Sequence, residues 1–496
     1  MGVARRGMAL EMSFVDTVRS AVAWRSGSQI IAQIITWSVT LIVVRILDPG
    51  DYGLFAMGQV IITFLSFLNG YGFASALIQR ETIDRQMVRQ TFGMLILVNL
   101  ALAATQFALA PVVADYYGQP LIEKLLHVQV VLFLSVPFVA IPEVLLMRNL
   151  DFKRPAIVNV VAAIISAGVA LACALAGMGV WALVWAPIAL FWTRAIGLTI
   201  AAKSLDWPSF DFRGSKHLFT YGSWILASHF CWTVATQADI FLAGSRLDAH
   251  DVGLYAEAIF LVTIVTARFI PPLNDVAFPS FARLQSDRQA LARAFLTAVR
   301  LIMLVVSPIF LGMSAAAEPL VLTAFGPKWG EMAPIVATLA LAMPAFTVYI
   351  LFSPAFNAID RPDLSAKSSA IVAAILVIAF LIGLSDGASG LAWAWVCASP
   401  FLPLAAMIVG GRALQLDTGG LLGAITPGLG AACGMALIVH AIAASLPAMA
   451  PPLELVILVG SGAIAYFALV YALRREMLFE LIRLVVRRQA PPVPVG

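Results

Sequence analysis

Long apolar runs alternate with short polar segments along nearly the whole chain. We expect a first set of helices near residues 28–47, 52–79, 91–116, 121–146, 155–176 and 179–202. A second set follows near 217–246, 252–282, 294–316, 332–359, 366–385 and 388–410, and a final pair near 421–444 and 453–473. Because about twenty apolar residues span the hydrocarbon core of a bilayer as a helix, the pattern predicts an all-α integral membrane protein with about 14 transmembrane helices.

Composition excludes a soluble globular class. Hydrophobic residues make up 61% of the 496-residue chain and charged residues 12%, with a mean hydropathy of +0.94. Soluble domains carry about 25% charged residues, so this chain cannot cover a water-facing surface. Transmembrane strands alternate apolar and polar positions, whereas these apolar runs are unbroken, and a helical bundle is therefore expected.

Charge and cysteine usage point to no further chemistry. The net charge of +4 comes from loop lysines and arginines and indicates no nucleic-acid partner. The four cysteines, Cys173, Cys231, Cys397 and Cys433, lie inside apolar runs without the spacing of metal ligands. We expect packing cysteines, no disulfide framework, no metal site and no cofactor.

Lysine and arginine residues predict the orientation in the membrane. With the helices placed as above, 24 of the 31 fall in the two tails and in alternate loops, and four fall on the opposite side. Cytoplasmic loops hold these residues in excess. Both termini are therefore expected in the cytoplasm, in a multi-pass protein of the bacterial inner membrane.

The chain contains an internal repeat with an offset of 200 residues. Residues 47–56 and 247–256 are identical at six of ten positions, and each segment joins a first helix to a second. Six helices per repeat place both repeats in the membrane in the same sense, an architecture of transporters whose substrate lies between the halves. Short turns also favour glycine and aspartate by themselves, which is the alternative explanation of the match.

The repeat sets the expected domain organisation. We predict two six-helix lobes related by a parallel repeat, followed by a C-terminal helix pair. The segments are a cytoplasmic N-terminal tail (1–27), an N-lobe of helices 1–6 (28–202), a cytoplasmic linker (203–216), a C-lobe of helices 7–12 (217–410), helices 13–14 (421–473) and a cytoplasmic C-terminal tail (474–496).

Seven short motifs occur in order along the chain. They are Val44–Gly53, Leu146–Lys153 with its Arg148-x-x-x-Phe152-Lys153 element, Gly179–Leu183, Asp239–Gly244, Pro279–Gln285, Phe325–Trp329 and Asp360–Asp363. Together they resemble the polysaccharide transporter branch of the multidrug/oligosaccharidyl-lipid/polysaccharide (MOP) flippase superfamily, in particular the flippases for O-antigen and exopolysaccharide (colanic-acid-type) repeat units. Asp360 stands where many relatives carry glycine.

The resemblance implies a function in lipopolysaccharide or exopolysaccharide biosynthesis. It implies a flippase that moves a polyprenyl-pyrophosphate-linked oligosaccharide from the cytoplasmic to the periplasmic leaflet by alternating access. The implied partners are this lipid-linked oligosaccharide, membrane lipid and other polysaccharide assembly proteins, with no nucleic acid.

Arg268 is the leading candidate for a substrate-binding residue. It lies about ten residues or more from either end of the eighth helix, where a charged side chain costs about 2.5–3.5 kcal/mol on insertion scales. Its planar guanidinium suits a pyrophosphate, to which it donates parallel hydrogen bonds. Glu257 shares its helix face at 100° per residue, so an internal Arg268–Glu257 pair is the alternative.

Three further charged residues could have either a functional or a purely structural role. Arg25 precedes the first helix and either guides the pyrophosphate at the cytoplasmic mouth or serves only orientation. Asp239 in the seventh helix either binds substrate or forms a structural pair with a cation or an arginine. Glu143 is expected to pair with Arg148 on the fourth helix. Polar residues within the predicted helices, such as Asn99 and Gln106, either line a hydrated cavity or pack between helices.

Two other classes of protein are considered. A cation-coupled multidrug exporter of the same superfamily would bind smaller cations, and it usually ends at twelve helices. A membrane polysaccharide polymerase or glycosyltransferase needs a sizeable external loop with catalytic residues, and the predicted external loops are only a few residues long. No phosphate loop, zinc-ligand cluster or nucleophile elbow is present in the sequence. We therefore predict a transporter without catalytic residues, not an enzyme.

Overall fold

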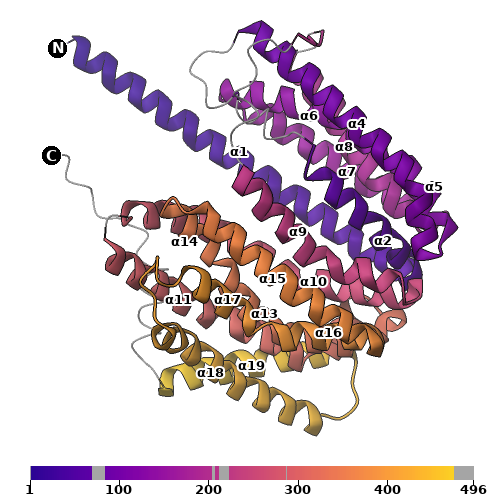
Figure 1. Ribbon diagram of the computed structural model, residues 1–496, viewed down its shortest axis with the longest axis vertical. Coiled ribbons are helices and arrows are strands. Elements are labelled where there is room, and N and C mark those ends of the chain that lie inside the picture. The colour runs from indigo at the N-terminus through magenta and orange to yellow at the C-terminus, as the bar shows by residue number, and fades with distance from the viewer. Residues whose placement is uncertain are drawn as a thin grey trace. The chain divides into compact units, whose positions relative to one another are not determined.

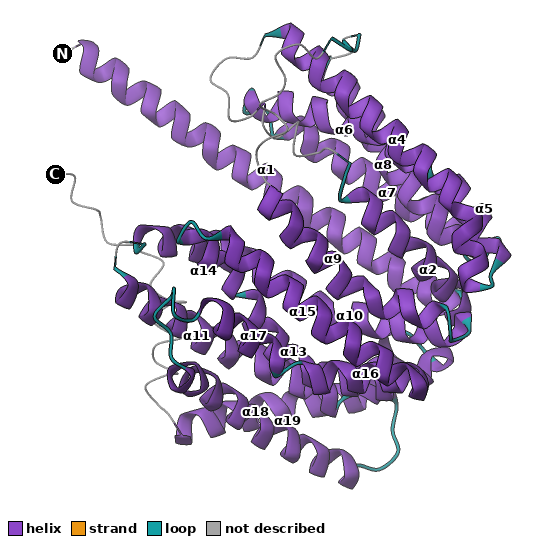
Figure 2. Ribbon diagram, in the orientation of Figure 1, coloured by secondary structure: helices purple, strands orange, loops and turns teal. Residues whose placement is uncertain are grey.

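The chain folds as a bundle of helices. The computed structural model describes residues 2–69, 77, 84–203, 207–211, 223–285 and 287–473, and of 2–23, 223–228, 267–280, 282 and 473 it describes the backbone alone. Within these ranges every regular element is helical and no strand occurs (Figure 2). Eleven stretches of the described chain are long and apolar enough to cross a membrane. The all-α membrane fold predicted from the apolar runs is confirmed.

The first of two compact units comprises Met1–Ser223 and Gly244–Gly253. Its helices are α1 (Gly2–Ile46), α2 (Pro49–Ser66), α4 (Arg85–Tyr117), α5 (Pro120–Gln129), α6 (Val131–Arg148), α7 (Lys153–Leu175) and α8 (Trp181–Ala202) (Figure 1). Helix α7 packs against both α1 and α8, α6 packs against α8, and α4 packs against α5 and α6.

The second unit comprises Trp224–Ala243 and Leu254–Gly496. Its elements are α9 (Ser223–Gly244), α10 (Ala249–Arg283), α11 (Arg288–Ala315), α12 (Ala317–Ala324), η2 (Pro327–Met332), α13 (Ala333–Ile350), α14 (Phe352–Ala358), α15 (Pro362–Gly383), η3 (Leu384–Asp386), α16 (Gly387–Ala398), α17 (Phe401–Gly410), α18 (Thr418–Ser445) and α19 (Pro451–Leu473). Helix α11 packs against α13 and α18, and α18 packs against α19.

The predicted crossings correspond to helices or to helix pairs. The apolar stretch Pro362–Gly410 contains two of them, because α15 covers the first and α16 with α17 covers the second. The predicted helix 121–146 is divided into α5 and α6, which meet at Val130. Helix α1 begins at Gly2 rather than near residue 28, and its apolar part runs from Trp24 to Ile46. A total near fourteen crossings follows, while the exact lobe boundaries remain predictions.

Aspartates begin several of the helices. Asp84, Asp287 and Asp417 each accept a hydrogen bond from the backbone N–H three residues ahead, at 2.6, 3.0 and 2.8 Å. Such N-caps satisfy donors that have no partner within the helix and contribute about 1 kcal/mol each. They explain why these helices begin where polar residues interrupt the apolar pattern.

Each repeated turn has a backbone-to-carboxylate hydrogen bond between its two shared aspartates, in opposite directions in the two repeats. The backbone N–H of Asp48 donates to the carboxylate of Asp51 at 3.3 Å, and the N–H of Asp251 donates to the carboxylate of Asp248 at 2.8 Å. Both bonds join positions three residues apart at the start of α2 or α10. The aspartates shared by the two repeats therefore have a capping role in each.

The two repeated turns also contact each other. The contact lies within the first unit, because the first turn of α10, up to Gly253, belongs to that unit. A Cβ atom built on Gly53 would overlap the carbonyl oxygen of Ala249, and one built on Gly253 would overlap that of Pro49. Positions 49 and 249, like 53 and 253, are equivalent at the offset of 200. The first turns of α2 and α10 thus cross backbone against backbone, which only glycine at both positions permits. We call this contact the glycine crossing.

Two polar residues of α4 are buried inside the first unit. The side-chain amide of Asn99 donates to the carbonyl oxygens of Asn69 and Leu95, both at 2.9 Å, and that of Gln106 donates to Leu126 at 2.7 Å. Both side chains are almost fully shielded. Buried amides need such partners; the Asn99 Oδ1 and the Gln106 Oε1 have none among the described residues, so packing between helices satisfies only the donor half of each amide.

Candidate functional site

The four predicted site residues lie on three helices. Arg268 is on α10, and its side chain lies outside the described residues. Glu257 is also on α10 and is partly buried, whereas Arg25 on α1 is exposed. Asp239 on α9 is 1% exposed. Of the four, Asp239 has the most hydrogen-bond partners among the described residues, and we build the site from this residue.

Asp239 forms a buried polar cluster with two aromatic residues of the second unit. One carboxylate oxygen accepts a hydrogen bond from the Tyr255 hydroxyl at 2.9 Å and from the Trp395 indole N–H at 3.4 Å. The indole also donates to the Tyr255 hydroxyl at 3.0 Å. The other carboxylate oxygen accepts from the backbone N–H of Ile240 at 2.8 Å. Helices α9, α10 and α16 are thereby joined at one carboxyl group.

An aromatic wall encloses this cluster. Phe346 of α13 meets Trp395 edge to face, with ring centroids 5.3 Å apart. Trp232 of α9 stacks on Phe346 at 5.7 Å and on Tyr349 at 6.3 Å. Such aromatic pairs contribute about 0.5–1.5 kcal/mol beyond their buried area. Trp232 is thus packed against aromatic side chains of α13 within this unit.

The partners of Asp239 differ from the arginine or cation expected in a structural pair. They are a hydroxyl, an indole and a backbone amide, which are neutral donors. A carboxylate with several donors keeps its hydrogen-bonding capacity satisfied away from water. The cluster therefore joins three helices through one titratable carboxyl group, and any change in its charge acts on all three.

An intramembrane ion pair was missed in the sequence. Arg194 of α8 lies 3.5 Å from the carboxylate of Glu143 on α6. Glu143 had been expected to pair with Arg148, but the Arg148 guanidinium donates to the carbonyl oxygen of Leu77 at 3.0 Å. The reason is the packing of α6 against α8, which brings together residues 51 positions apart.

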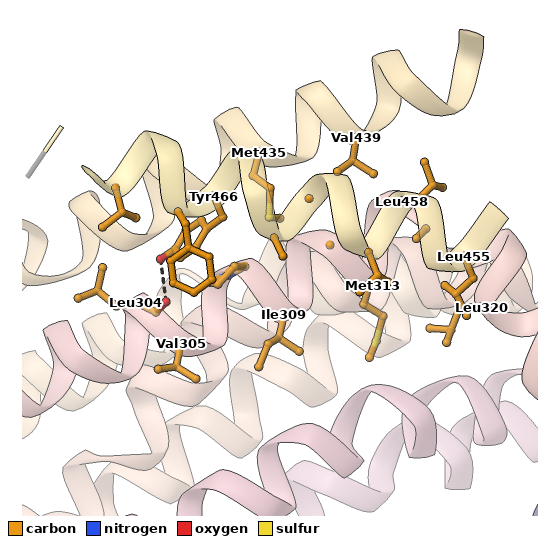
Figure 3. Close-up of a pocket in the computed structure, with 18 residues that line it drawn as sticks. Leu304, Val305, Ile309, Met313, Leu320, Met435, Val439, Leu455, Leu458 and Tyr466 are labelled. Atoms are coloured by element: carbon orange, nitrogen blue, oxygen red, sulfur yellow. Dashed lines mark hydrogen bonds between the residues drawn. The ribbon is translucent and has the colours of Figure 1, made fainter. Parts of the chain in front are cut away.

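A large apolar groove lies in the second unit between α11, α12, α18 and α19. Its volume is about 570 Å³, and Ile309, Met313, Met435, Leu455 and Leu458 are among its lining residues (Figure 3). The hydroxyl of Tyr466 points to the carbonyl oxygen of Leu304 and donates to it at 2.7 Å. The groove thus offers no polar group to a ligand and suits hydrocarbon chains.

The arrangement shows no metal centre in the described part of the chain, where no group of three or more histidine, cysteine or acidic side chains comes together. What the described residues provide is a helical, membrane-embedded scaffold with buried polar clusters and apolar grooves. These features define the class of multi-pass helical membrane proteins.

The chain belongs to the family of polysaccharide biosynthesis proteins, which it matches over residues 42–334. It is 25% identical over 470 residues to the succinoglycan biosynthesis transport protein ExoT of Rhizobium meliloti (strain 1021), covering 92% of this chain and 93% of the relative. It is 22% identical over 390 residues to the lipopolysaccharide biosynthesis protein WzxC of Escherichia coli (strain K12), covering 75% and 76%.

The fold is similar to that of the lipid II flippase MurJ in an inward closed conformation. The TM-score is 0.72 at 14% sequence identity, covering 90% of this chain and 99% of that protein. At this identity the likeness concerns the fold. The membership of the polysaccharide transporter branch of the MOP superfamily, expected from the seven motifs, is confirmed by the family match and the relatives.

Proposed function

We propose that this chain is a flippase that moves polyprenyl-pyrophosphate-linked oligosaccharide repeat units from the cytoplasmic to the periplasmic leaflet by alternating access. The observation that carries the proposal is the similarity, along 92% of the chain, to a transport protein of polysaccharide biosynthesis. The name of this relative supports transport of a polysaccharide component. The polyprenyl-pyrophosphate linkage of the substrate is inferred from the resemblance of the seven motifs to those of flippases.

The physical task explains why such a protein has this composition. A sugar headgroup and a pyrophosphate cannot cross a hydrocarbon core about 30 Å thick without polar surroundings. The lipid tail can stay in hydrocarbon throughout. A carrier of this substrate therefore needs apolar outer surfaces, apolar grooves and a few intramembrane charges, for which Arg268, Glu257, Arg25 and Asp239 remain our candidates.

The proposal is tested by transport in liposomes. Purified protein is reconstituted with a fluorescently labelled polyprenyl-pyrophosphate-linked oligosaccharide in the inner leaflet. We expect the label to become accessible to an impermeant quencher faster than in protein-free liposomes. An unchanged rate together with extrusion of a small cationic dye would instead identify a multidrug exporter and overturn the proposal.

We propose further that the protein lies in the bacterial inner membrane with both termini in the cytoplasm. The distribution of 24 lysines and arginines on one side against four on the other supports this orientation. Reporter fusions after Arg85 and Leu446 are expected to report cytoplasm and periplasm, respectively. The inverse pattern, or one compartment for both sites, would contradict the topology.

The transport step we propose makes and breaks no bond. Other polysaccharide assembly proteins are expected to supply the lipid-linked oligosaccharide on one side of the membrane and to remove it on the other. These partners stay predictions. The pyrophosphate linkage requires that a sugar 1-phosphate be transferred from a nucleotide sugar to a polyprenyl phosphate carrier before this step, with the nucleoside monophosphate as the leaving group.

A further inference from the structure

A second groove lies in the first unit, where α1 and α7 pack along each other. Its volume is about 490 Å³, and Trp24, Gly27 and Ile31 line it from α1. The spacing of these three residues places them on one helix face. A Cβ atom built on Gly27 would meet no atom within 4 Å, so this glycine leaves open space between the helices.

The α7 wall of the groove is made of small and branched apolar residues. Ile157, Val160 and Val161 line it, one to two turns into the helix. Ile157 and Val161 are 47% and 43% exposed, and in a membrane such surface faces hydrocarbon. None of the residues that line this groove is charged, and the hydroxyl of Ser28, which also lines it, donates to the carbonyl oxygen of Arg25 at 3.0 Å. The body of the groove therefore suits a hydrocarbon chain.

One end of the groove is cationic. The Lys153 ammonium lies 5.4 Å from the centroid of the Trp24 ring, a cation–π contact with a residue that lines the groove. Arg154 follows Lys153, but its guanidinium lies 3.3 Å from the carboxylate of Asp151 and donates to the carbonyl oxygen of Ala201 on α8 at 3.2 Å, so it is not counted as part of this site. Arg25, adjacent to Trp24, is exposed. The Lys153 ammonium thus lies at the Trp24 end of the apolar track, and Arg25 precedes the track on α1.

The combination of an apolar track and a positively charged end distinguishes the α1–α7 groove from the larger groove between α11, α12, α18 and α19. The larger groove is lined by apolar residues and by Tyr466, whose hydroxyl already has a partner. Nothing in its lining holds a headgroup. The α1–α7 groove joins a hydrocarbon track to fixed positive charge, as an amphiphile with an anionic head requires.

We propose that the α1–α7 groove is a binding site for the lipid carrier of the substrate. The isoprenoid chain lies along the apolar track, and the pyrophosphate lies at Lys153 and Arg25. A single track between two helices fits one chain, whereas a glycerophospholipid carries two. The proposal rests on the proposed function, and it gives a role to the lysine of the Arg148-x-x-x-Phe152-Lys153 motif.

Photo-crosslinking in the full-length protein tests this site. A benzoylphenylalanine replaces Ile157, and the purified protein is irradiated with undecaprenyl pyrophosphate in mixed micelles. Leu437 on α18, 74% exposed on an apolar helix, receives the same probe as the matched control. We expect a mass adduct of the isoprenoid at position 157 that is at least about tenfold more abundant than at 437.

The headgroup contact is tested in the same experiment. Lys153→Ala should lower the yield at position 157 by about tenfold, because a hydrogen bond to a charged group is lost, and Lys124→Ala should leave the yield unchanged. An excess of phosphatidylglycerol should not displace the adduct. Equal yields at 157 and 437 would overturn the proposal, and so would displacement by phosphatidylglycerol, which would indicate a general phospholipid site.

Failure of the site and failure of the function are distinguishable. If wild-type protein transports the lipid-linked oligosaccharide in liposomes but the Ile157 probe variant gives no adduct, the groove proposal alone is wrong. If the Ile157 probe variant gives the adduct but wild-type protein does not transport the lipid-linked oligosaccharide, the groove proposal is supported and the proposed transport function is wrong.

Discussion

Gly53→Leu is expected to abolish transport and to lower the amount of folded protein in the membrane. At Gly53 a Cβ atom would overlap the carbonyl oxygen of Ala249, which is backbone and cannot rotate away. Overpacking of flexible cores already costs about 1–3 kcal/mol, and a backbone overlap forces α2 and α10 apart. Transport in liposomes and thermal unfolding in detergent measure the two effects.

Smaller substitutions separate the glycine crossing from a general effect of glycine replacement. Gly53→Ala and Gly253→Ala should both impair transport, because each adds the same overlap from opposite sides of the crossing. Gly50→Ala is the matched control, since a Cβ atom there has no neighbour within 4 Å. If the Gly53→Ala variant transports as well as the Gly50→Ala variant, the glycine crossing is not required for transport and the prediction is wrong.

Arg268→Ala is expected to abolish transport while leaving folded protein in the membrane. A guanidinium that binds the pyrophosphate donates two parallel hydrogen bonds, which lysine cannot reproduce. Arg268→Lys should therefore transport poorly although it keeps the charge. Loss of the arginine would also leave Glu257 without the partner expected from their shared helix face, so a modest loss of stability is expected too.

The double variant Arg268→Ala/Glu257→Ala discriminates substrate contact from charge balance. At wild-type abundance in the membrane it should remain inactive. The Arg194–Glu143 pair, 3.5 Å apart in the first unit, provides the matched control. Arg194→Ala/Glu143→Ala removes a comparable intramembrane pair and should retain transport. Normal transport by the Arg268 double variant would show that this arginine only balances Glu257.

The sequence by itself determined the class of the protein and the course of its chain. Runs of about twenty apolar residues leave helices as the structure that satisfies its own backbone in lipid, so helix positions follow from local composition. The repeat at residues 47–56 and 247–256 is also a local signal. Capping by Asp48 and Asp51 at the start of α2 follows from residues three positions apart.

Only the tertiary structure decided which distant residues meet. Trp395 reaches Asp239 across 156 positions, and Arg194 rather than Arg148 reaches Glu143, because helix packing selects partners by face and depth. Apolar periodicity is weak in helices that are hydrophobic all round, so the sequence did not reveal which face of α1 meets α7. The glycine crossing and the α1–α7 groove depend on the distance between helices, which no local pattern encodes.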